Sequence, residues 1–331
     1  MNSRFVSSSL KNENEERFEQ SLRPKTFDEV IGREAEKQSL SIMIESAKKR
    51  GKALDHIMFH GPPGLGKTTL SYVVASEMNV PIHITSGSAI EKTGDLAAIL
   101  TSLEPNSILF IDEIHRLKRT IEEILYPAME DNVLDIVIGK GPSAKTLRLE
   151  LNQFTIIGAT TKLSMISAPL RDRFGMHFRL DFYSDDELTL LVQQKARLLG
   201  IEIDDEASLK IAQRSRMTAR IAIRILKRVF DLAVVKGEKI INPYLVEETL
   251  SMMGVDENGL DELDRAILRS ILKNFNNRPV GLNTLAASLS EEPETIELVY
   301  EPFLIKKGLI QRTMRGRIAT DLAQKLYGDK L

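Results

Sequence analysis

A glycine-rich stretch carries the residues whose types and spacing most clearly suggest chemistry. GPPGLGKT occupies positions 61–68, after an apolar segment and before a helical pattern. In such a loop the backbone N–H groups and the helix N-terminus face phosphate oxygens, a lysine neutralises their charge, and a threonine hydroxyl reaches Mg²⁺. The alternative is a flexible turn without a ligand. We expect a nucleotide site in which the phosphates are held by Gly64, Gly66, Lys67, Thr68 and Thr69, with Thr68 also bound to Mg²⁺.

Two adjacent carboxylates, Asp112 and Glu113, end the apolar segment ILFI at positions 108–111. At the tip of a buried strand, Asp112 is expected to hold the Mg²⁺ shell and Glu113 to polarise a water for attack on the γ-phosphate. The alternative is that one of the two acids only caps the following helix. The chain has no N-K-x-D guanine-reading motif, so ATP is favoured over GTP.

Composition excludes several other kinds of site. The 331-residue chain has 45 Lys and Arg against 47 Asp and Glu, a net charge of -2, so any site for a polyanion has to be a local patch. Without cysteine it has no disulfide, thiolate nucleophile or thiolate zinc site, and five scattered histidines without an H-E-x-x-H motif argue against a transition-metal centre. No apolar run is long enough to cross a bilayer, so we expect a soluble cytoplasmic protein without membrane contact.

The elements that position these residues follow from periodicity. We expect a solvated tail over 1–20 and then an α/β domain with a mostly parallel sheet over 21–182, interrupted by a β-hairpin at 133–151 around the turn 140–144. A segment of helices only follows over 183–254. Three helices and a two-stranded ribbon around 314–316 then predict a winged helix-turn-helix over 255–331. The predicted strands of the sheet lie near 56–59, 80–85, 107–112, 154–160 and 177–182.

Three phrases, GPPGLGKTTL, LFIDEIHRL and GATT…APLRDRFG, together resemble the AAA+ ATPase family. Finer phrases, among them EKTGDLAAILTSLEP and PVGLNTLAASLSEEPETIELVYEPFLIKKGLIQRT, resemble the Holliday-junction branch-migration motors of that family over about 22–320. The resemblance implies an AAA+ P-loop domain with a parallel sheet, an all-α lid and a winged-helix domain. It also implies ATP with Mg²⁺ and a homohexameric ring around double-stranded DNA.

The resemblance also assigns roles around the nucleotide. Leu22 and Arg23 match adenine-pocket positions, and Tyr183 matches a position that stacks on the base. The loop 130–132 matches a further stretch near the nucleotide. Its residues are Glu130, Asp131 and Asn132. The alternative for Leu22 and Arg23 is an ordinary turn at the start of the domain. The alternative for the loop 130–132 is a simple helix end.

Three further residues would complete catalysis by this resemblance. Thr161 matches the polar sensor at the end of the fourth strand, although Thr160 is nearly as plausible because strand alternation lets only one point inward. Arg173 matches the finger that one subunit supplies to the next, which spreads the charge of the transition state; local salt bridging is the alternative. Arg220 matches the lid arginine that reaches the γ-phosphate.

Partner contacts are assigned in the same way. The hairpin 133–151 occupies the place where such motors dock RuvA, and its apolar faces, with Ile136 and Ile138 on one strand, would need a covering partner. A hairpin that packs on its own domain is the alternative. RuvC would join in a resolvase complex. Residues 302–331 carry seven basic and two acidic side chains, and the wing arginines suited to DNA phosphates are Arg312, Arg315 and Arg317.

Three stretches depart from the pattern of these motors. MTAR at 217–220 replaces the usual G-T-P-R, so the lid helix is expected to start earlier and shift Arg220. Pro293 stands where an arginine is common, which would remove one phosphate contact, and MRGR at 314–317 replaces P-R-G-R.

Taken together, the motifs and the resemblance predict a DNA-dependent motor ATPase for branch migration in recombination and repair. An ATP-gated DNA-binding switch or loader is the alternative.

Overall fold

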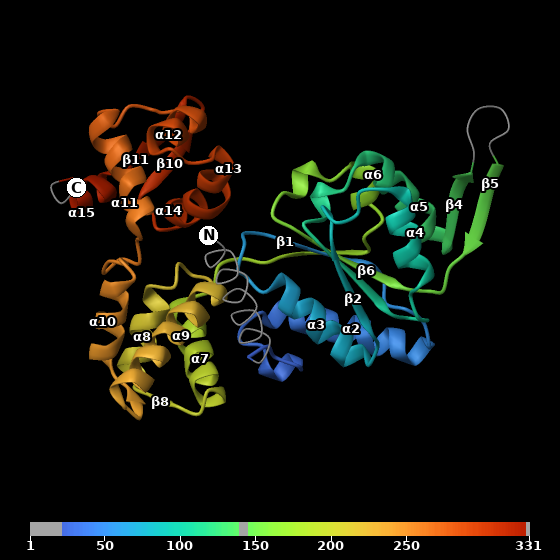
Figure 1. The fold of residues 1–331 in the computed structure, drawn as a ribbon, viewed down its shortest axis with the longest axis horizontal. Coiled ribbons are helices and arrows are strands. Elements are labelled where there is room, and N and C mark those ends of the chain that lie inside the picture. The colour runs from blue at the N-terminus through green and yellow to red at the C-terminus, as the bar shows by residue number, and fades with distance from the viewer. Residues whose placement is uncertain (1–21, 139–144, 329–331) are drawn as a thin grey trace, which may run out of the picture. The chain divides into compact units, whose positions relative to one another are not determined.

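The computed structural model describes residues 22–138 and 145–328 (Figure 1). The expected tail over 1–20 and the predicted turn 140–144 lie outside these residues. The described chain forms two compact units: the first holds residues 23–61 and 66–181, and the second holds 62–65 and 182–328 together with Leu22. The glycine-rich loop therefore contributes residues to both units.

Five parallel strands form the sheet of the first unit, in the order β2-β3-β6-β1-β7. All five predicted strands are confirmed, and β1, β3 and β6 are almost entirely buried, as the central strands of a parallel sheet require. Because β6 pairs with β1 on one side and β3 on the other, the carboxyl ends of these three strands meet at one edge. The strands are β1 Ile57–His60, β2 Ile82–Ser86, β3 Ile108–Asp112, β6 Thr155–Thr160 and β7 Met176–Arg179.

Helices cover both faces of this sheet, with α2 and α3 on one face and α4 and α5 on the other (Figure 1). The apolar positions of α4 and α5, such as Leu96, Leu100 and Leu125, share a core with Leu109 and Ile111 of β3. Burial of these side chains is the main force holding the helices to the sheet. The helices are α2 Glu34–Arg50, α3 Lys67–Met78, α4 Thr93–Thr101, α5 Arg119–Asp131 and α6 Ala168–Arg171, with short turns at Phe27–Glu29, Ile114–Arg116 and Leu163–Met165.

The predicted hairpin is confirmed as the antiparallel pair β4 Val133–Ile138 and β5 Lys145–Glu150. It projects from the first unit beyond the end of α5 (Figure 1). Leu134, paired with Leu149, is fully buried at the base of the hairpin, so the hairpin is anchored in the core of its own unit.

The second unit begins with four helices: α7 Asp185–Leu198, α8 Asp205–Gln213, α9 Ala219–Lys236 and α10 Pro243–Met252. As expected, Ser184 caps α7, accepting from the N–H of Glu187 while the Glu187 carboxylate accepts from the N–H of Ser184. The prediction of helices alone in this stretch is wrong. Two residues of each connecting loop form a short parallel pair, β8 Glu202–Ile203 with β9 Ile240–Ile241, which is too short for a sequence pattern to reveal.

The turn before α9 also differs from expectation. The helix begins at Ala219 and does not start earlier, because Thr218 caps it by accepting from the N–H of Ile221 at 3.4 Å. Arg216 and Met217 just before it have φ of 52° and 56°, a left-handed conformation that interrupts any helix. Met217 adopts this conformation without the glycine that usually makes it favourable.

The rest of the second unit is a winged helix with its own core, formed by residues such as Ile267, Leu285 and Leu304. Val280 pairs with Arg317, adding a third short stretch of strand to the predicted ribbon. The final helix was not predicted from the sequence, and it buries Tyr327 in this core. The elements are α11 Glu262–Arg269, η5 Ser270–Asn274, α12 Leu282–Leu289, α13 Pro293–Thr295, η6 Ile296–Tyr300, α14 Glu301–Lys306, β10 Ile310–Thr313, β11 Gly316–Ala319 and α15 Asp321–Tyr327.

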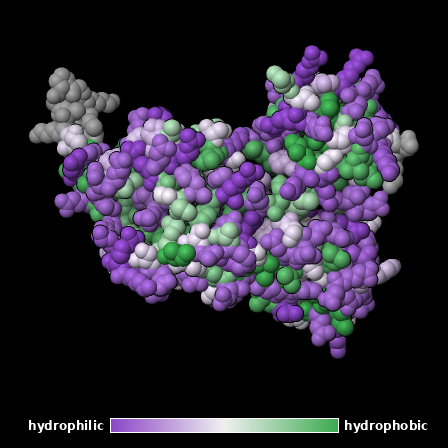
Figure 2. Space-filling model, turned by 180° about the vertical axis from the view of Figure 1, so that it is seen from behind, coloured by the Kyte–Doolittle hydropathy of each residue, from purple (hydrophilic) through white to green (hydrophobic). Residues whose placement is uncertain are grey.

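The surface is mainly hydrophilic on the face shown in Figure 2, with apolar side chains in scattered spots. Val235 on α9, Tyr244 on α10 and Met314 between β10 and β11 are among the exposed apolar residues. Single exposed apolar side chains are ordinary on protein surfaces and do not by themselves mark a partner. Within the described part of the chain, no helix is long and apolar enough to cross a membrane.

Candidate nucleotide site and DNA-binding wing

The glycine-rich loop follows β1 and leads into α3, as its motif requires. Gly64 and Gly66 have φ of 78° and 93°, so both positions need a residue without a Cβ. Lys67 is almost fully buried and donates from Nζ to the Gly61 carbonyl at 2.8 Å, which holds the ammonium inside the loop. Thr68 and Thr69 lie half-buried in the first turn of α3. The loop thus has the backbone shape and the cation that polyphosphate binding requires.

The two acids stand at the carboxyl end of β3. One oxygen of Asp112 accepts from the N–H of Glu113 at 2.9 Å. Glu113 has φ 48° and ψ 43°, a left-handed conformation that a glutamate rarely adopts. Strain of this kind persists where the surrounding structure enforces it, commonly at functional sites. Here the carbonyl of Glu113 lies so close to Gly87 that a Cβ on Gly87 would be 2.4 Å from its oxygen.

A short chain of side chains connects Glu113 with the end of β6. His115 is buried, with Nε2 at 3.3 Å from the Glu113 carboxylate and Nδ1 at 2.9 Å from Thr160 Oγ1. Thr160 Oγ1 also accepts from the N–H of Lys162 at 2.9 Å, so this hydroxyl is already engaged. Thr161 Oγ1 is buried and has no hydrogen-bond partner among the described residues. Of the two candidate sensors, Thr161 is therefore the one whose hydroxyl is available to a ligand.

Arg173 is held by three groups of its own unit. Its guanidinium pairs with Glu130 at 3.0 Å, donates to the Pro169 carbonyl at 2.6 Å and stacks on the ring of Tyr126 at 4.3 Å. This fixes the arginine at the start of the loop 130–132, whose residue Asn132 ends α5 with φ 54°. The resemblance assigned Arg173 and Glu130 separately, whereas the structure brings them together.

The remaining residues predicted near the nucleotide fall into the two units. Arg23, in the first unit, stacks on the ring of Tyr72 at 4.2 Å, while Leu22 is counted with the second unit and is 2% exposed. In the second unit Tyr183 is buried and its N–H donates to the Met217 carbonyl at 3.0 Å. Arg220 has an exposed side chain, and its backbone N–H donates to the Gly64 carbonyl at 3.3 Å.

Among the hairpin residues whose burial the structure describes, one apolar residue is largely exposed and the others are partly or fully covered. Ile136, Leu149 and Leu151 pack partly against the core, whereas the side chain of Leu147 is 44% exposed. On the other face Arg148 donates two hydrogen bonds of 2.8 Å to Asp135, which lowers the pKa of that carboxyl through the hydrogen bond and its charge. Of the hairpin's apolar side chains whose burial is described, Leu147 is thus the one most open to a partner.

The three arginines of the wing differ in their surroundings. Glu301, 1% exposed, accepts from Arg312 at 2.8 Å and from Arg317 at 2.9 Å. The side chain of Arg317 is only 11% exposed, whereas that of Arg312 is 51% exposed and reaches Glu297 as well. Arg315 is exposed in the turn beside Met314 and has no ion pair within the described ranges. Arg317 therefore serves the wing internally, while Arg312 and Arg315 face solvent.

Comparison with known proteins assigns the chain to a family. The model of the Holliday junction DNA helicase RuvB P-loop domain matches residues 22–180, that of the RuvB AAA lid domain 183–256, and that of the RuvB C-terminal winged helix domain 257–328. The chain belongs to the RuvB family. A Holliday junction branch migration complex subunit RuvB from Fusobacterium nucleatum is 54% identical over 322 residues, which cover 97% of each chain. Its counterpart from Fervidobacterium nodosum is 55% identical over 93% of this chain and 89% of its own length.

Solved RuvB structures share the fold. The Thermotoga maritima RuvB Holliday junction branch migration motor superposes with a TM-score of 0.84 at 48% identity, covering 92% of this chain and 97% of that one. The expected α/β P-loop domain, helical lid and winged helix are thereby confirmed as the RuvB architecture.

Several residues that shape these RuvB-type sites were missed by reasoning from the sequence. His115 and Gly87 position Glu113, and Glu301 holds two wing arginines. His115 had a weak signal, since it stands two residues after Glu113 in DEIH. Glu301 had no sequence signal, because an acid inside an otherwise apolar helix pattern is ordinarily solvent-exposed and is not expected to hold buried arginines.

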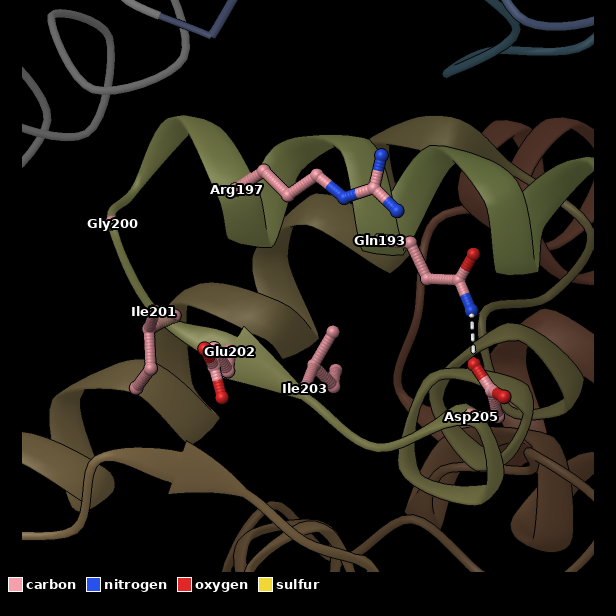
Figure 3. Close-up of a pocket in the computed structure, with 7 residues that line it drawn as sticks. All are labelled: Gln193, Arg197, Gly200, Ile201, Glu202, Ile203 and Asp205. Atoms are coloured by element: carbon pink, nitrogen blue, oxygen red, sulfur yellow. Dashed lines mark hydrogen bonds between the residues drawn. The ribbon is translucent and has the colours of Figure 1, made fainter.

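A pocket in the lid of this RuvB-family chain stands apart from the predicted residues (Figure 3). It lies between α7, β8 and the start of α8, where Gln193 donates to Asp205 at 2.9 Å. No residue predicted from the sequence lines it. The lining residues are Gln193, Arg197, Gly200, Ile201, Glu202, Ile203 and Asp205.

Replacing Glu301 with glutamine is expected to destabilise the winged helix by about 3 kcal/mol, because removing one partner of a buried ion pair leaves the other charge uncompensated. Burial alone would raise the pKa of Glu301, but the hydrogen bonds and charges of Arg312 and Arg317 outweigh it and lower the pKa. A carboxyl with a lowered folded pKa contributes stability above its unfolded pKa of about 4.3 and loses it as pH falls further. Chemical denaturation between pH 3 and 7 measures both effects.

The matched control is Glu297→Gln, since Glu297 is more exposed and meets Arg312 at 3.4 Å. Exposed pairs contribute about 0 to 1 kcal/mol, so this variant should unfold close to the wild type. Equal stability of the two variants, with no difference in their pH dependence, would contradict the structural role of Glu301.

Proposed function

We propose that this protein is an ATP-driven motor that moves Holliday junctions along DNA, as its RuvB relatives are named. The observation that carries the proposal is the meeting of three elements at one edge of the sheet. The phosphate loop with Lys67 follows β1. Asp112 and Glu113 lie at the end of β3, and Thr161 directly follows β6. Together they can hold a triphosphate, its metal and an attacking water.

The residues of the phosphate loop and of the ends of β3 and β6 fit ATP and Mg²⁺. Two left-handed glycines shape the loop, and the buried Thr161 hydroxyl lacks a partner, as expected of a group that awaits a ligand. Within the described residues no three acidic or histidine side chains gather into a metal cluster, which suits an ion carried by the nucleotide. When bound, Mg·ATP supplies the activated γ-phosphate, and Thr68 and Asp112 would hold its metal.

The protein's own groups supply positioning and charge. Lys67 neutralises the phosphates, and Glu113, oriented by His115, accepts a proton from the attacking water. Thr161 contacts the γ-phosphate. Arg173 of a neighbouring subunit supplies positive charge to the transition state, and Arg220 connects the lid with the phosphate loop. Leu22, Arg23 and Tyr183 contact the base, and Asp131 and Asn132 lie beside Glu130 at the subunit boundary.

The assembly and its partners complete the proposal. Subunits form a homohexameric ring in the cytoplasm around double-stranded DNA, which is contacted through phosphates by Arg312 and Arg315, with Arg317 positioning the wing. RuvA docks on the hairpin 133–151, where Leu147 is exposed, and RuvC joins in a resolvase complex. The domain limits we propose are 21–182 for the ATPase domain, 183–254 for the lid and 255–331 for the winged helix.

Movement of a synthetic four-way junction tests this function. With Mg²⁺, ATP and RuvA from the same cell, we expect the junction to separate into duplex arms, and we expect no separation with a non-hydrolysable ATP analogue. ATP hydrolysis without any movement of the junction would contradict a motor and favour an ATP-gated switch or loader. Sequence-preferring DNA binding would point to the same alternative.

A further inference from the structure

A buried arginine joins the lid to the winged helix inside the second unit. Arg216 lies in the turn between α8 and α9, and its side chain is 9% exposed. An arginine is seldom buried unless its guanidinium finds several partners. Among the described residues, every hydrogen-bond partner of this guanidinium lies in the winged helix, 45 or more residues further along the chain.

Two of these partners are the acids that cap α11. Asp261 accepts from the N–H of Asp264 at 2.9 Å, and Asp264 accepts from the N–H of Asp261 at 3.0 Å. One nitrogen of Arg216 pairs with Asp264 and lies 3.3 Å from Asp261. A single guanidinium therefore holds both halves of the cap that starts the first helix of the winged helix.

The other partners belong to η6 and α14, which follow each other without a break and form one helical stretch before the wing. The second terminal nitrogen of Arg216 donates to the Val299 carbonyl at 3.1 Å. The guanidinium also lies over the rings of Tyr300 and Phe303, at 4.8 and 4.6 Å from their centres. Such contacts suit a planar guanidinium far better than an ammonium. The arginine is thus bound to two different helices of the same domain.

On the lid side, the same turn is linked to two residues assigned to the nucleotide, Tyr183 and Arg220. Met217, the next residue, accepts from the N–H of Tyr183, and four residues after Arg216 the N–H of Arg220 donates to Gly64 of the phosphate loop. The left-handed conformations of Arg216 and Met217 set the course of this turn. A displacement of the turn therefore moves the guanidinium directly.

The contact between Arg216 and Asp264 is buried and leaves little room for substitution. Asp264 is fully buried, its second oxygen has no partner among the described residues, and burial raises its pKa to about 7 while Arg216 opposes the rise. Without the guanidinium, Asp264 would have no cation beside it among the residues that the structure describes. Gly259 packs against the backbone of Arg214 so closely that a Cβ would lie 3.1 Å from Arg214 Cα, which brings a second part of the chain to the same place.

We propose that Arg216 is the positioning residue that couples the nucleotide-reading turn of the lid to the winged helix. The inference rests on the proposed motor function, because it assigns the path by which a nucleotide change in the lid would reach the DNA-binding wing. Arg216 contacts neither nucleotide nor DNA in this role. It makes the lid turn and the two bound helices move as one body.

A distance measurement tests the coupling without hydrolysis or DNA. The chain has no cysteine, so Val235→Cys on α9 and Leu322→Cys on α15, both exposed positions, take spin labels at known sites. In the full-length protein with Mg·ADP or a non-hydrolysable ATP analogue, we expect one narrow distance distribution. Arg216→Lys should broaden it in both states, and Asp261→Asn, which removes a partner from the other side but can still cap α11, should broaden it too. An unchanged distribution in both variants would overturn the proposal.

The matched control is Arg214→Lys. Arg214 is in the same turn and its side chain is 11% exposed, but it pairs with Glu247 inside the lid, so its replacement should leave the distribution narrow. In junction assays Arg216→Lys should keep the DNA-independent ATPase rate while the junction steps made per ATP fall about tenfold, a typical size for coupling between sites. An equal fall of both quantities would indicate a general folding defect and refute a coupling role. Failure of the wild type to move junctions would contradict the motor but leave the distance test valid.

Discussion

Replacing Glu113 with glutamine should abolish ATP turnover while ATP remains bound. Removing a general base of this kind costs about 10² to 10⁴ in rate. Glutamine keeps the size of the side chain but cannot accept the proton of the attacking water. Lys67 and Thr68, which we propose hold the nucleotide, lie in a different loop, so nucleotide binding should be unaffected. Single-turnover hydrolysis and equilibrium nucleotide binding, measured on the same preparation, separate the two effects.

Glu123→Gln provides the control for this substitution. Glu123 is exposed on α5 and pairs with Arg119 at 3.3 Å, well inside the range of ordinary surface ion pairs. Its replacement should leave both binding and hydrolysis unchanged. Turnover by Glu113→Gln within a few-fold of the wild type would remove Glu113 from the catalytic role, and the strained backbone at this residue would need another explanation.

Arg173→Ala should inactivate a ring made of one kind of subunit. An arginine finger contributes about 10³ to 10⁵ to the rate of related phosphoryl transfers, so the ATPase rate should fall to near background. The structure holds this guanidinium against Glu130, Pro169 and Tyr126 of its own subunit. These contacts restrict the side chain before a neighbour arrives, which lowers the entropy lost when it engages a phosphate.

Mixing variants tests whether Arg173 acts on the neighbouring subunit. Arg173→Ala subunits keep an intact phosphate loop, and Lys67→Ala subunits keep an intact Arg173. Neither should hydrolyse ATP alone, but mixed rings should recover part of the activity where one supplies its arginine to the other. Arg179→Ala, which removes an exposed arginine paired with Asp181 at 3.1 Å, should stay fully active. No recovery in rings shown to contain both variants would contradict supply between subunits.

The sequence alone was enough to predict the fold and the places of the phosphate loop and of Asp112 and Glu113 in it. Buried parallel strands are nearly continuous apolar runs, so ILFI before Asp112 and TIIGA before Thr160 were recognisable without any tertiary information. The phosphate loop is equally local, because its glycines, lysine and threonine act through spacing along one turn of chain. The resemblance then supplied roles for distant residues such as Arg173 and Arg220.

The tertiary structure decided which polar groups are already engaged. Thr160 and Thr161 are adjacent and chemically identical, and it is His115, 45 residues away, that occupies the hydroxyl of Thr160 and leaves that of Thr161 unpaired. Arg317 and Arg315 differ in whether their guanidinium is already paired, since the buried Glu301 pairs with Arg317. The sequence does not distinguish Arg216 from other basic residues, because its partners lie 45 to 83 residues away. Spacing along the chain defines local geometry, whereas the partner of a buried charge is set by packing between segments that the sequence keeps far apart.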